Sequence, residues 1–345
     1  MKITKILVAL SFLFAVSTAN AGEMTVTGNM ETTYITNNDG NTGNPLGMDK
    51  ELKFAGSTEL DNGITLSVMQ DTNDSLTFGN SQISFGNVMG LATIYVGSDH
   101  DPMDSVDDIT PSAYEEANGS GSGTYTSNDI GDLAGQMGIG TKFDVPGLGN
   151  VNAKYYPKAD GAKNNDNAAS AAANANKGSG LSIVTKTNLG DVSEGIFDGA
   201  TLTLGYEEVE NSLATGTRDQ NGYTGALTYA TGPVSLGIQK KYHYEGQGVA
   251  TATAAADEAL FLDTILGVAY AVNDNLSVSV NRYTSKKRSN NPTRPVFGEQ
   301  ESTAFNVGYT IGGMTIGLQD ASTDNSGYTV GSNDDTRTLG ISVSF

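Results

Sequence analysis

The chain of 345 residues contains no cysteine, no tryptophan and only two histidines, His100 and His243. Without cysteine there is no disulfide framework and no thiolate chemistry. The two histidines lie far apart in the sequence, and the chain has no His-rich metal motif, no G-x-S-x-G elbow and no phosphate-binding P-loop. These absences disfavour the common classes of enzyme, so we expect a protein that is not an enzyme.

Positive charge is also scarce, because 19 Lys and Arg stand against 39 Asp and Glu and the formal charge is −20. A protein that grips nucleic-acid phosphates needs an excess of the opposite sign, so we expect no nucleic-acid partner. A strongly negative field instead attracts cations. Part of the excess has a simpler interpretation, since acidic side chains keep exposed loops soluble.

Long apolar runs are missing as well. After the first 21 residues no stretch of about eighteen apolar residues occurs, so the sequence predicts no transmembrane helix. The first 21 residues have two lysines, Lys2 and Lys5, then an apolar stretch over 6–16 and the small-x-small sequence Ala19-Asn20-Ala21. This pattern is typical of a Sec signal peptide, and its apolar core is too short for a membrane anchor. We expect 1–21 to be removed and 22–345 to form one domain.

What the sequence has in abundance is alternation. Segments of roughly ten residues place apolar side chains at every second position, with turn residues between the segments. In the first, Met24, Val26 and Met30 share one face; in the last, Leu339, Val343 and Phe345 do so. We expect about sixteen such strands.

The connections between these strands alternate between short and long. Short ones include 61–63, 231–232 and 312–313, whereas the longest lie at 99–134 and 158–179. An even number of strands with short turns at one end and long loops at the other is typical of an outer-membrane barrel. An outward apolar face then meets lipid, and closure leaves no unpaired edge. We therefore expect an all-β fold, a transmembrane antiparallel up-and-down β-barrel of sixteen strands.

Four features carry a family resemblance: the opening "GEMTVTGNMETTY", the hairpin "QISFGNVMGLATIYVGSDHD", the acidic segment after it, and the terminal Phe345. The chain resembles the sixteen-stranded general porins of Gram-negative outer membranes, most closely those of alphaproteobacteria. The resemblance implies a water-filled channel for passive diffusion of small hydrophilic solutes and ions. It further implies a homotrimer joined through the first and last strands. Outer-membrane lipid and lipopolysaccharide would be partners, and Phe345 would be the signal that the barrel-assembly machinery reads.

In that family the third long loop folds into the lumen and narrows it, which makes 99–134 the expected constriction loop. Its candidate acidic residues are Asp99, Asp101, Asp104, Asp107, Asp108, Glu115 and Glu116. With an acidic loop and an acidic chain, we expect the channel to prefer cations.

A basic wall is expected opposite the loop, and parity selects its members because lumen and lipid faces alternate along a strand. Five lysines are opposite in parity to outward apolar neighbours: Lys53, Lys142, Lys154, Lys186 and Lys241. Arg282 shares the parity of Val280 and so points outward by simple alternation. A bulge, or a place near the rim, would bring it to the pore, and we keep it as a weaker candidate for the pore wall.

Alternatives remain at two points. The sequence "DHDPMD" bunches oxygen ligands of the kind that Ca²⁺ takes, at Asp99, Asp101 and Asp104, but without EF-hand spacing. Solvated acids are the simpler interpretation, and we expect no other cofactor. The barrel itself could be a substrate-specific channel, or a surface adhesin or receptor with a closed pore.

Overall fold

The computed structural model describes residues 22, 24–37, 43–72, 75, 77–117, 130–159, 177–211, 218–246, 259–289 and 297–345. The expected signal peptide, 1–21, lies outside the described residues, and so do parts of the loops at 99–134 and 158–179. No helix among the described residues is long and apolar enough to span a membrane.

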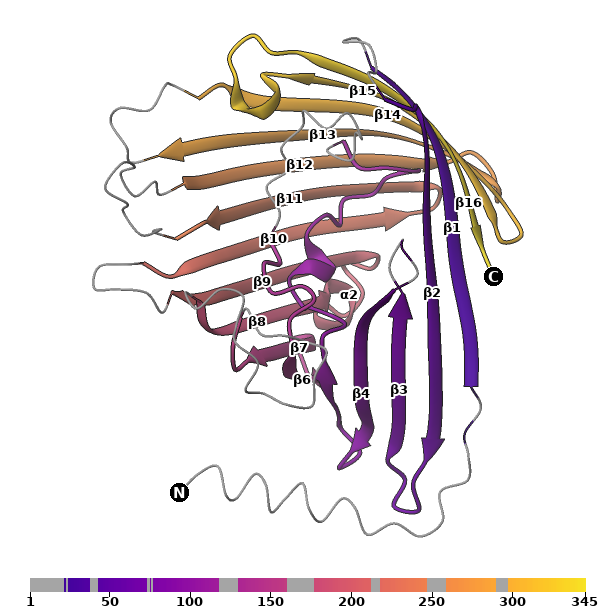
Figure 1. Ribbon diagram of the computed structural model, residues 1–345, viewed down its shortest axis with the longest axis vertical. Helices are drawn as coiled ribbons and strands as arrows, with labels where there is room; N and C mark the ends of the chain where they lie inside the picture. The colour runs from indigo at the N-terminus through magenta and orange to yellow at the C-terminus, as the bar shows by residue number, and fades with distance from the viewer. Residues whose placement is uncertain are drawn as a thin grey trace.

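Sixteen antiparallel strands form one closed barrel in chain order, with β1 paired to β16 (Figure 1). The strands are β1 (Met24–Asn37), β2 (Leu46–Glu59), β3 (Thr65–Thr72), β4 (Phe78–Val88), β5 (Ala92–Gly97), β6 (Gly138–Val145), β7 (Gly149–Tyr156), β8 (Lys177–Asn188), β9 (Ala200–Asn211), β10 (Gln220–Thr231), β11 (Val234–Tyr244), β12 (Ala259–Ala271), β13 (Leu276–Ser289), β14 (Glu299–Ile311), β15 (Met314–Asp324) and β16 (Asp334–Ser344). The fold predicted from alternation is confirmed.

The two ends of the chain close the barrel. Met30 lies opposite Val343 in the β1–β16 ladder. Beyond it, Gly28 and Phe345 exchange two backbone hydrogen bonds of 2.9 and 3.0 Å. The Phe345 ring lies against Gly28, where a Cβ would come within 2.5 Å of the ring. The terminal aromatic therefore needs a glycine beside it, and the last residue is paired rather than loose.

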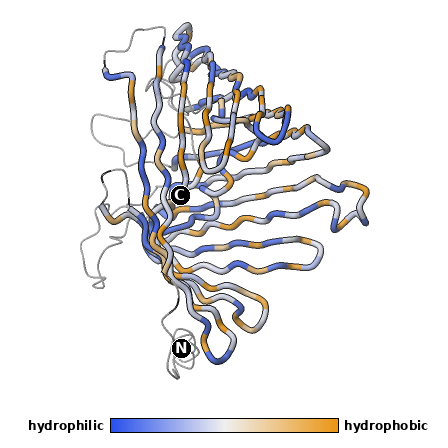
Figure 2. The backbone as a smooth tube through the Cα atoms, turned by 90° about the vertical axis from the view of Figure 1, so that its right-hand side faces the viewer, coloured by the Kyte–Doolittle hydropathy of each residue, from blue (hydrophilic) through white to orange (hydrophobic). Residues whose placement is uncertain are grey.

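The two faces of each strand differ as the alternation predicts, and Figure 2 shows polar and apolar residues following one another along the tube. Outward side chains such as Leu227, Leu266 and Phe305 are exposed, each by more than 40%. Lumen-facing side chains such as Gln239 and Gln319 are buried. The barrel is thus apolar outside and polar inside, the reverse of a soluble protein.

Strand boundaries depart from the sequence prediction at the long-loop end. β2 begins at Leu46 and β13 continues to Ser289, so both intrude into segments that the sequence assigned to loops. In the β13 extension, 286–289, polar residues occupy both faces, so the period-two signal fades while the hydrogen-bond ladder continues. In the β2 extension Leu46 and Met48 still carry the apolar outward face. The connection after β8 holds a short helix, α2 (Leu189–Val192), capped by the Asn188 side chain, which accepts from the Gly190 N–H at 3.0 Å.

Strand length divides the barrel into a low wall and a high wall. β3, β5, β6 and β7 have 8, 6, 8 and 8 residues. β12, β13 and β14 have 13, 14 and 13. The low wall reaches less far along the barrel axis than the high wall.

Candidate functional site: the loop inside the barrel

The segment after β5 contacts lumen-facing side chains far around the barrel. The backbone N–H of Met103 donates to Ser182 Oγ on β8 at 3.0 Å. That of Ile109 donates to Gln239 Oε1 on β11 at 3.0 Å, and that of Ala113 to Ser279 Oγ on β13 at 2.9 Å. A short 3₁₀ turn, η2 (Asp104–Val106), lies on this path and is drawn within the ring of strands in Figure 1. Residues 98–117 therefore follow the inner wall from β8 towards β16.

Three buried amides of the wall satisfy the carbonyls of this segment. Gln239 donates to the carbonyls of Val106 and Asp107, both at 2.7 Å. Asn281 donates to Pro111 at 2.8 Å and Gln319 to Glu116 at 2.9 Å. Buried polar groups need such partners, so the amides and the loop hold one another in place. The alternation pattern alone did not single out these residues; the signal that could have found them is the run of inward Gln and Asn on β11, β13 and β15.

A tyrosine seats the far end of the segment. The Tyr114 ring lies over Gly317 and Gly340, which pair across β15 and β16, and a Cβ on Gly340 would come within 1.9 Å of its hydroxyl. The hydroxyl donates to Glu31 Oε1 on β1 at 2.7 Å. Because the two glycines have no side chain, the Tyr114 ring can pack directly on the backbone there. The loop therefore reaches the strands β16 and β1, where the barrel closes.

The acidic residues of the loop separate into two groups. Three of them turn to the wall. Asp101 is buried and accepts from the Tyr156 hydroxyl at 2.9 Å. Asp107 and Asp108 lie 2.9 and 3.8 Å from Lys241 Nζ. These three carboxylates therefore serve to attach the loop.

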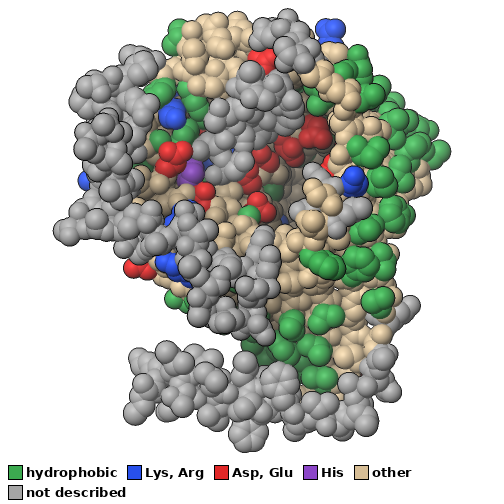
Figure 3. Space-filling view, viewed as in Figure 1, with side chains coloured by type: hydrophobic (Ala, Val, Ile, Leu, Met, Phe, Trp, Pro, Cys, Tyr) green, Lys and Arg blue, Asp and Glu red, His purple; other side chains and the backbone are tan. Residues whose placement is uncertain are grey.

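The other acids stay accessible. Asp99 lies 4.0 Å from Lys53, and Asp104 is exposed at the start of η2. Glu115 and Glu116 are half-buried. Figure 3 shows acidic side chains gathered around the hollow of the molecule.

Glu115 forms an acidic cavity together with the first two strands. The cavity has a volume of about 140 Å³ and its lining includes Glu31, Asp49 and Glu115, with no lysine or arginine. Burial, followed by repulsion from Glu116 and Glu31, raises the pKa of Glu115 to about 7. Burial also raises the pKa of Glu116. Glu115 therefore changes its charge close to neutral pH.

The predicted basic residues also divide into those that attach the loop and those that stay accessible. Lys154 is buried under the loop and donates to the carbonyls of Asp99 and His100, both at 3.1 Å. Lys241 is buried against Asp107. Lys53, Lys142 and Lys186 also face the lumen, but none of them is buried.

Arg282 is the exception. It lies on the outer surface, paired with Glu301 at 2.6 Å, because no bulge interrupts its alternation with Val280. The structure therefore does not place Arg282 in the pore wall.

The returning limb of the loop has its own attachment, which the sequence did not indicate. Asp132 Oδ2 lies 2.9 Å from His243 Nε2 on β11, and the Asp132 N–H donates to Glu207 on β9 at 3.1 Å. His243 thus fastens the loop.

Burial, followed by repulsion from the neighbouring lysines Lys142 and Lys154, lowers the pKa of His100 to about 4, so its ring is neutral at pH 7.

The described residues contain no group of three or more His, Cys, Asp or Glu side chains that could hold a metal ion. The calcium candidates Asp99, Asp101 and Asp104 are not brought together, since Asp101 turns to Tyr156 on β7.

A closed sixteen-stranded barrel, apolar outside and polar inside, defines an outer-membrane protein of the porin type. The family model described as Gram-negative porin matches residues 7–291, so the chain belongs to the Gram-negative porin family and to the outer membrane. Among curated proteins no match is found.

Solved structures share the fold at low sequence identity. The chain is similar to a porin refined at 1.8 Å, with 14% identity, 94% of this chain and 100% of that chain covered, and a TM-score of 0.64. It is similar to the trimer form of OmpT from Vibrio cholerae, with 11% identity, 94% and 100% covered, and a TM-score of 0.64. It is also similar to an anion-selective porin from Comamonas acidovorans, with 12% identity, 94% and 100% covered, and a TM-score of 0.62.

Proposed function

We propose that the protein is a diffusion porin in which residues 98–117 narrow a water-filled lumen and favour cations. Small hydrophilic solutes and ions pass down their gradients, and fixed charge biases ions by sign. The acidic cavity of Glu31, Asp49 and Glu115 carries the proposal. It gathers three carboxylates without a lysine or arginine in its lining, while the most deeply buried lysines are occupied by the loop.

Lys142 on β6 and Lys186 on β8 form the opposing positive side of the constriction, whereas Lys53 lies on β2 with Asp49 and next to Asp99. These three lysines are fewer than the accessible acids, and Lys53 and Lys142 are partly covered. A transverse field between the two sides orients charged solutes, and the excess of carboxylate sets the overall preference.

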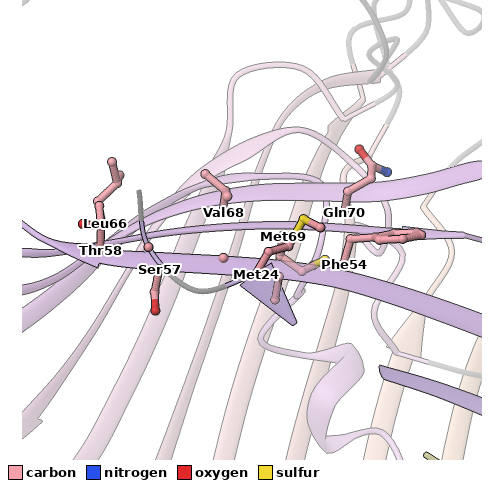
Figure 4. Close-up of a pocket in the computed structure, with 11 residues that line it drawn as sticks. Met24, Phe54, Ser57, Thr58, Leu66, Val68, Met69 and Gln70 are labelled. Atoms are coloured by element: carbon pink, nitrogen blue, oxygen red, sulfur yellow. The ribbon is translucent and has the colours of Figure 1, made fainter. Parts of the chain in front are cut away.

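We further propose that the protein assembles as a homotrimer through the outer face of β1–β3 and the short strands that follow it. The outer face of β1–β3 has a cavity of about 390 Å³ whose lining includes Met24, Phe54, Leu66 and Val68 (Figure 4). The neighbouring strands are too short to span as far as the high wall, which suits a wall covered by another copy. Phe345, beside this wall, would then serve as the signal for barrel assembly.

The decisive experiment is single-channel recording of refolded protein in a planar bilayer under a KCl gradient. We expect conductance steps that occur in groups of three, one for each subunit. We also expect a reversal potential whose sign shows that cations are more permeable than anions. A reversal potential of the opposite sign contradicts the cation preference. Silence from a barrel verified by heat-modifiable migration points to a closed-pore adhesin or receptor. Conductance that one solute blocks at low concentration points to a substrate-specific channel.

A further inference from the structure

Glu207 on β9 is a carboxyl group with only 1% exposure, and it contacts both limbs of the loop inside the barrel. The limb that leaves β5 carries Asp101, and the side chains of Asp101 and Glu207 are hydrogen-bonded to each other. The limb that returns to β6 carries Asp132, whose backbone N–H donates to Glu207 Oε1 at 3.1 Å. We call the two segments 98–103 and 130–136 the neck of the loop. Glu207 joins them at one point of the wall.

The contact between Asp101 and Glu207 needs a proton. Ionised carboxylates have acceptor oxygens only, so two of them cannot form a hydrogen bond with each other. Asp101 Oδ2 and Glu207 Oε2 are both buried, and neither finds a donor among the described residues. One hydrogen placed between the two carboxyl groups satisfies both. Two carboxyl groups that share a buried site hold such a proton, because their charges repel when both are ionised.

The wall beside Glu207 supplies no charge that could replace this proton. Its partners in the strand ladders are Ser182 on β8 and Gly222 on β10, and both are uncharged. The same inward row continues to Lys154 on β7 and His243 on β11, which pair with these two residues. Each basic residue is thus two strands from Glu207, or about 10 Å at the usual strand spacing.

Both basic residues also have other partners. Lys154 Nζ donates to three backbone carbonyls of the loop, and His243 Nε2 lies 2.9 Å from Asp132 Oδ2. Within the part of the chain that the structure describes, neither Asp101 nor Glu207 forms an ion pair. The buried pair is therefore neutralised by a hydrogen and not by a cation.

The donors around the pair assign the hydrogen to Glu207. Asp101 Oδ1 accepts from the Tyr156 hydroxyl at 2.9 Å and from the Met103 N–H at 3.4 Å, and these bonds stabilise a charged Asp101. Glu207 then donates to Asp101. Tyr156 and Leu133 belong to a buried apolar cluster at the neck, so little water reaches the site.

We propose that Glu207 is the positioning residue of the constriction: it holds a proton at neutral pH, donates it to Asp101, accepts from Asp132, and so keeps the neck of the loop closed. Loss of the proton in alkali places the carboxylates of Asp101, Asp132 and Glu207 together, and their repulsion loosens the neck. This inference rests on the proposed function in so far as residues 98–117 set the width of the pore.

The proton itself can be observed by infrared spectroscopy of the folded full-length protein in detergent. Glu207→Gln keeps a donor for Asp101 and an acceptor for Asp132. Glu208→Gln is the matched control, because Glu208 is the next residue of β9, has outward parity and accepts from the Tyr206 hydroxyl at 2.8 Å. At neutral pH we expect the absorption of protonated carboxyl groups to weaken in Glu207→Gln and to stay unchanged in Glu208→Gln.

The position of the loop needs a second measurement. Since the chain has no cysteine, the substitution S105C in the exposed part of the loop allows a single spin label there. We expect the label to be equally restricted in the unchanged background and in E207Q, and mobile in E207A, which offers neither donor nor acceptor. In the unchanged background the label should become mobile at the alkaline pH where the infrared absorption is lost, whereas E207Q should not respond. Heat-modifiable migration checks that each variant is folded.

Three results would overturn the proposal. Infrared absorption that is equal in E207Q and the unchanged protein would mean that Glu207 holds no proton. A label as mobile in E207Q as in E207A would mean that a neutral hydrogen-bonding side chain does not close the neck. A label that stays restricted in E207A would mean that other contacts close it. None of these measurements needs conduction, so a silent bilayer would count against the proposed function and leave the role of Glu207 intact.

Discussion

Two stretches of the inner wall carry the same residue type in the same parity and use it differently. Under the loop, Lys154 and Lys241 are buried and bind its carbonyls and carboxylates. On the open stretch, Lys53 keeps 43% of its side chain exposed beside Asp99. Strand alternation decides which way a lysine points. Its position relative to the loop decides whether it holds the structure together or faces the passing ion.

The largest difference between the two stretches should appear on removing a lysine from each. Lys241→Met leaves Asp107 and Asp108 facing an uncharged side chain in a buried site. Breaking a buried ion pair in this way costs about 3–5 kcal/mol. We expect a markedly lower free energy of unfolding in urea and a noisier channel. Lys53→Met is the control, and because that pair is exposed it should change stability by less than about 1 kcal/mol. Equal losses of unfolding free energy in both variants would mean that Lys241 holds the structure together no more than Lys53 does.

The contact of Tyr114 with the barrel wall can be weakened without changing a lysine. Tyr114→Phe keeps the ring over the glycines and removes the hydrogen bond to Glu31, so we expect a loss of about 1 kcal/mol and nearly unchanged conductance. Tyr114→Ala removes the ring as well, and the loop should move from the wall. Single-channel recording should then show larger and more variable conductance. Identical traces for the two variants would mean that the ring does not set the width of the pore.

The acidic side should respond to pH. Because the pKa of Glu115 is raised to about 7, its carboxylate gains a proton as the pH falls through 7, and the cavity becomes less negative. We expect the cation-to-anion permeability ratio to fall between pH 8 and pH 6 and to recover when the pH is raised. Glu115→Gln should give a low ratio at both pH values. A ratio that changes equally in the variant would assign the effect to another group.

The same shift has a consequence for stability. A carboxyl whose pKa is higher in the folded state than in the unfolded chain favours folding as the pH falls from about 7 towards its ordinary value near 4.5. This sign is opposite to that of an ion-paired carboxylate.

The smallest effect should come from the open lysines. Lys142→Gln removes one positive charge from the wall, so the cation preference should rise slightly. Salt screens accessible charges, so the change in reversal potential should be visible at 0.1 M KCl and nearly absent at 1 M. A shift that survives high salt would show that Lys142 lies closer to the ion path than its place beside Tyr95 suggests.

The barrel could be predicted because its rule is local: every second residue faces lipid, from Met24 to Phe345. The role of each charge could not, because it depends on contacts between distant segments. Lys241 meets Asp107 across 134 positions of sequence. Nothing within the loop itself distinguishes Asp107, which turns to the wall, from Glu115, which turns to the cavity. Arg282 shows the strength of the local rule, since alternation alone pointed it outward.

The pairing of Gly28 with Phe345 also has a consequence for the order in which the strands can pair during folding. The first strand finds its final neighbour only when β16 is present, and Ser344 meets Asn29 across 315 positions. Until then both edge strands offer unpaired backbone groups to any other extended chain. Contacts of such long range form slowly. A chain that lost its final residues would keep two open edges. Pairing of β16 with β1 therefore both closes the barrel and protects its two edges from other extended chains.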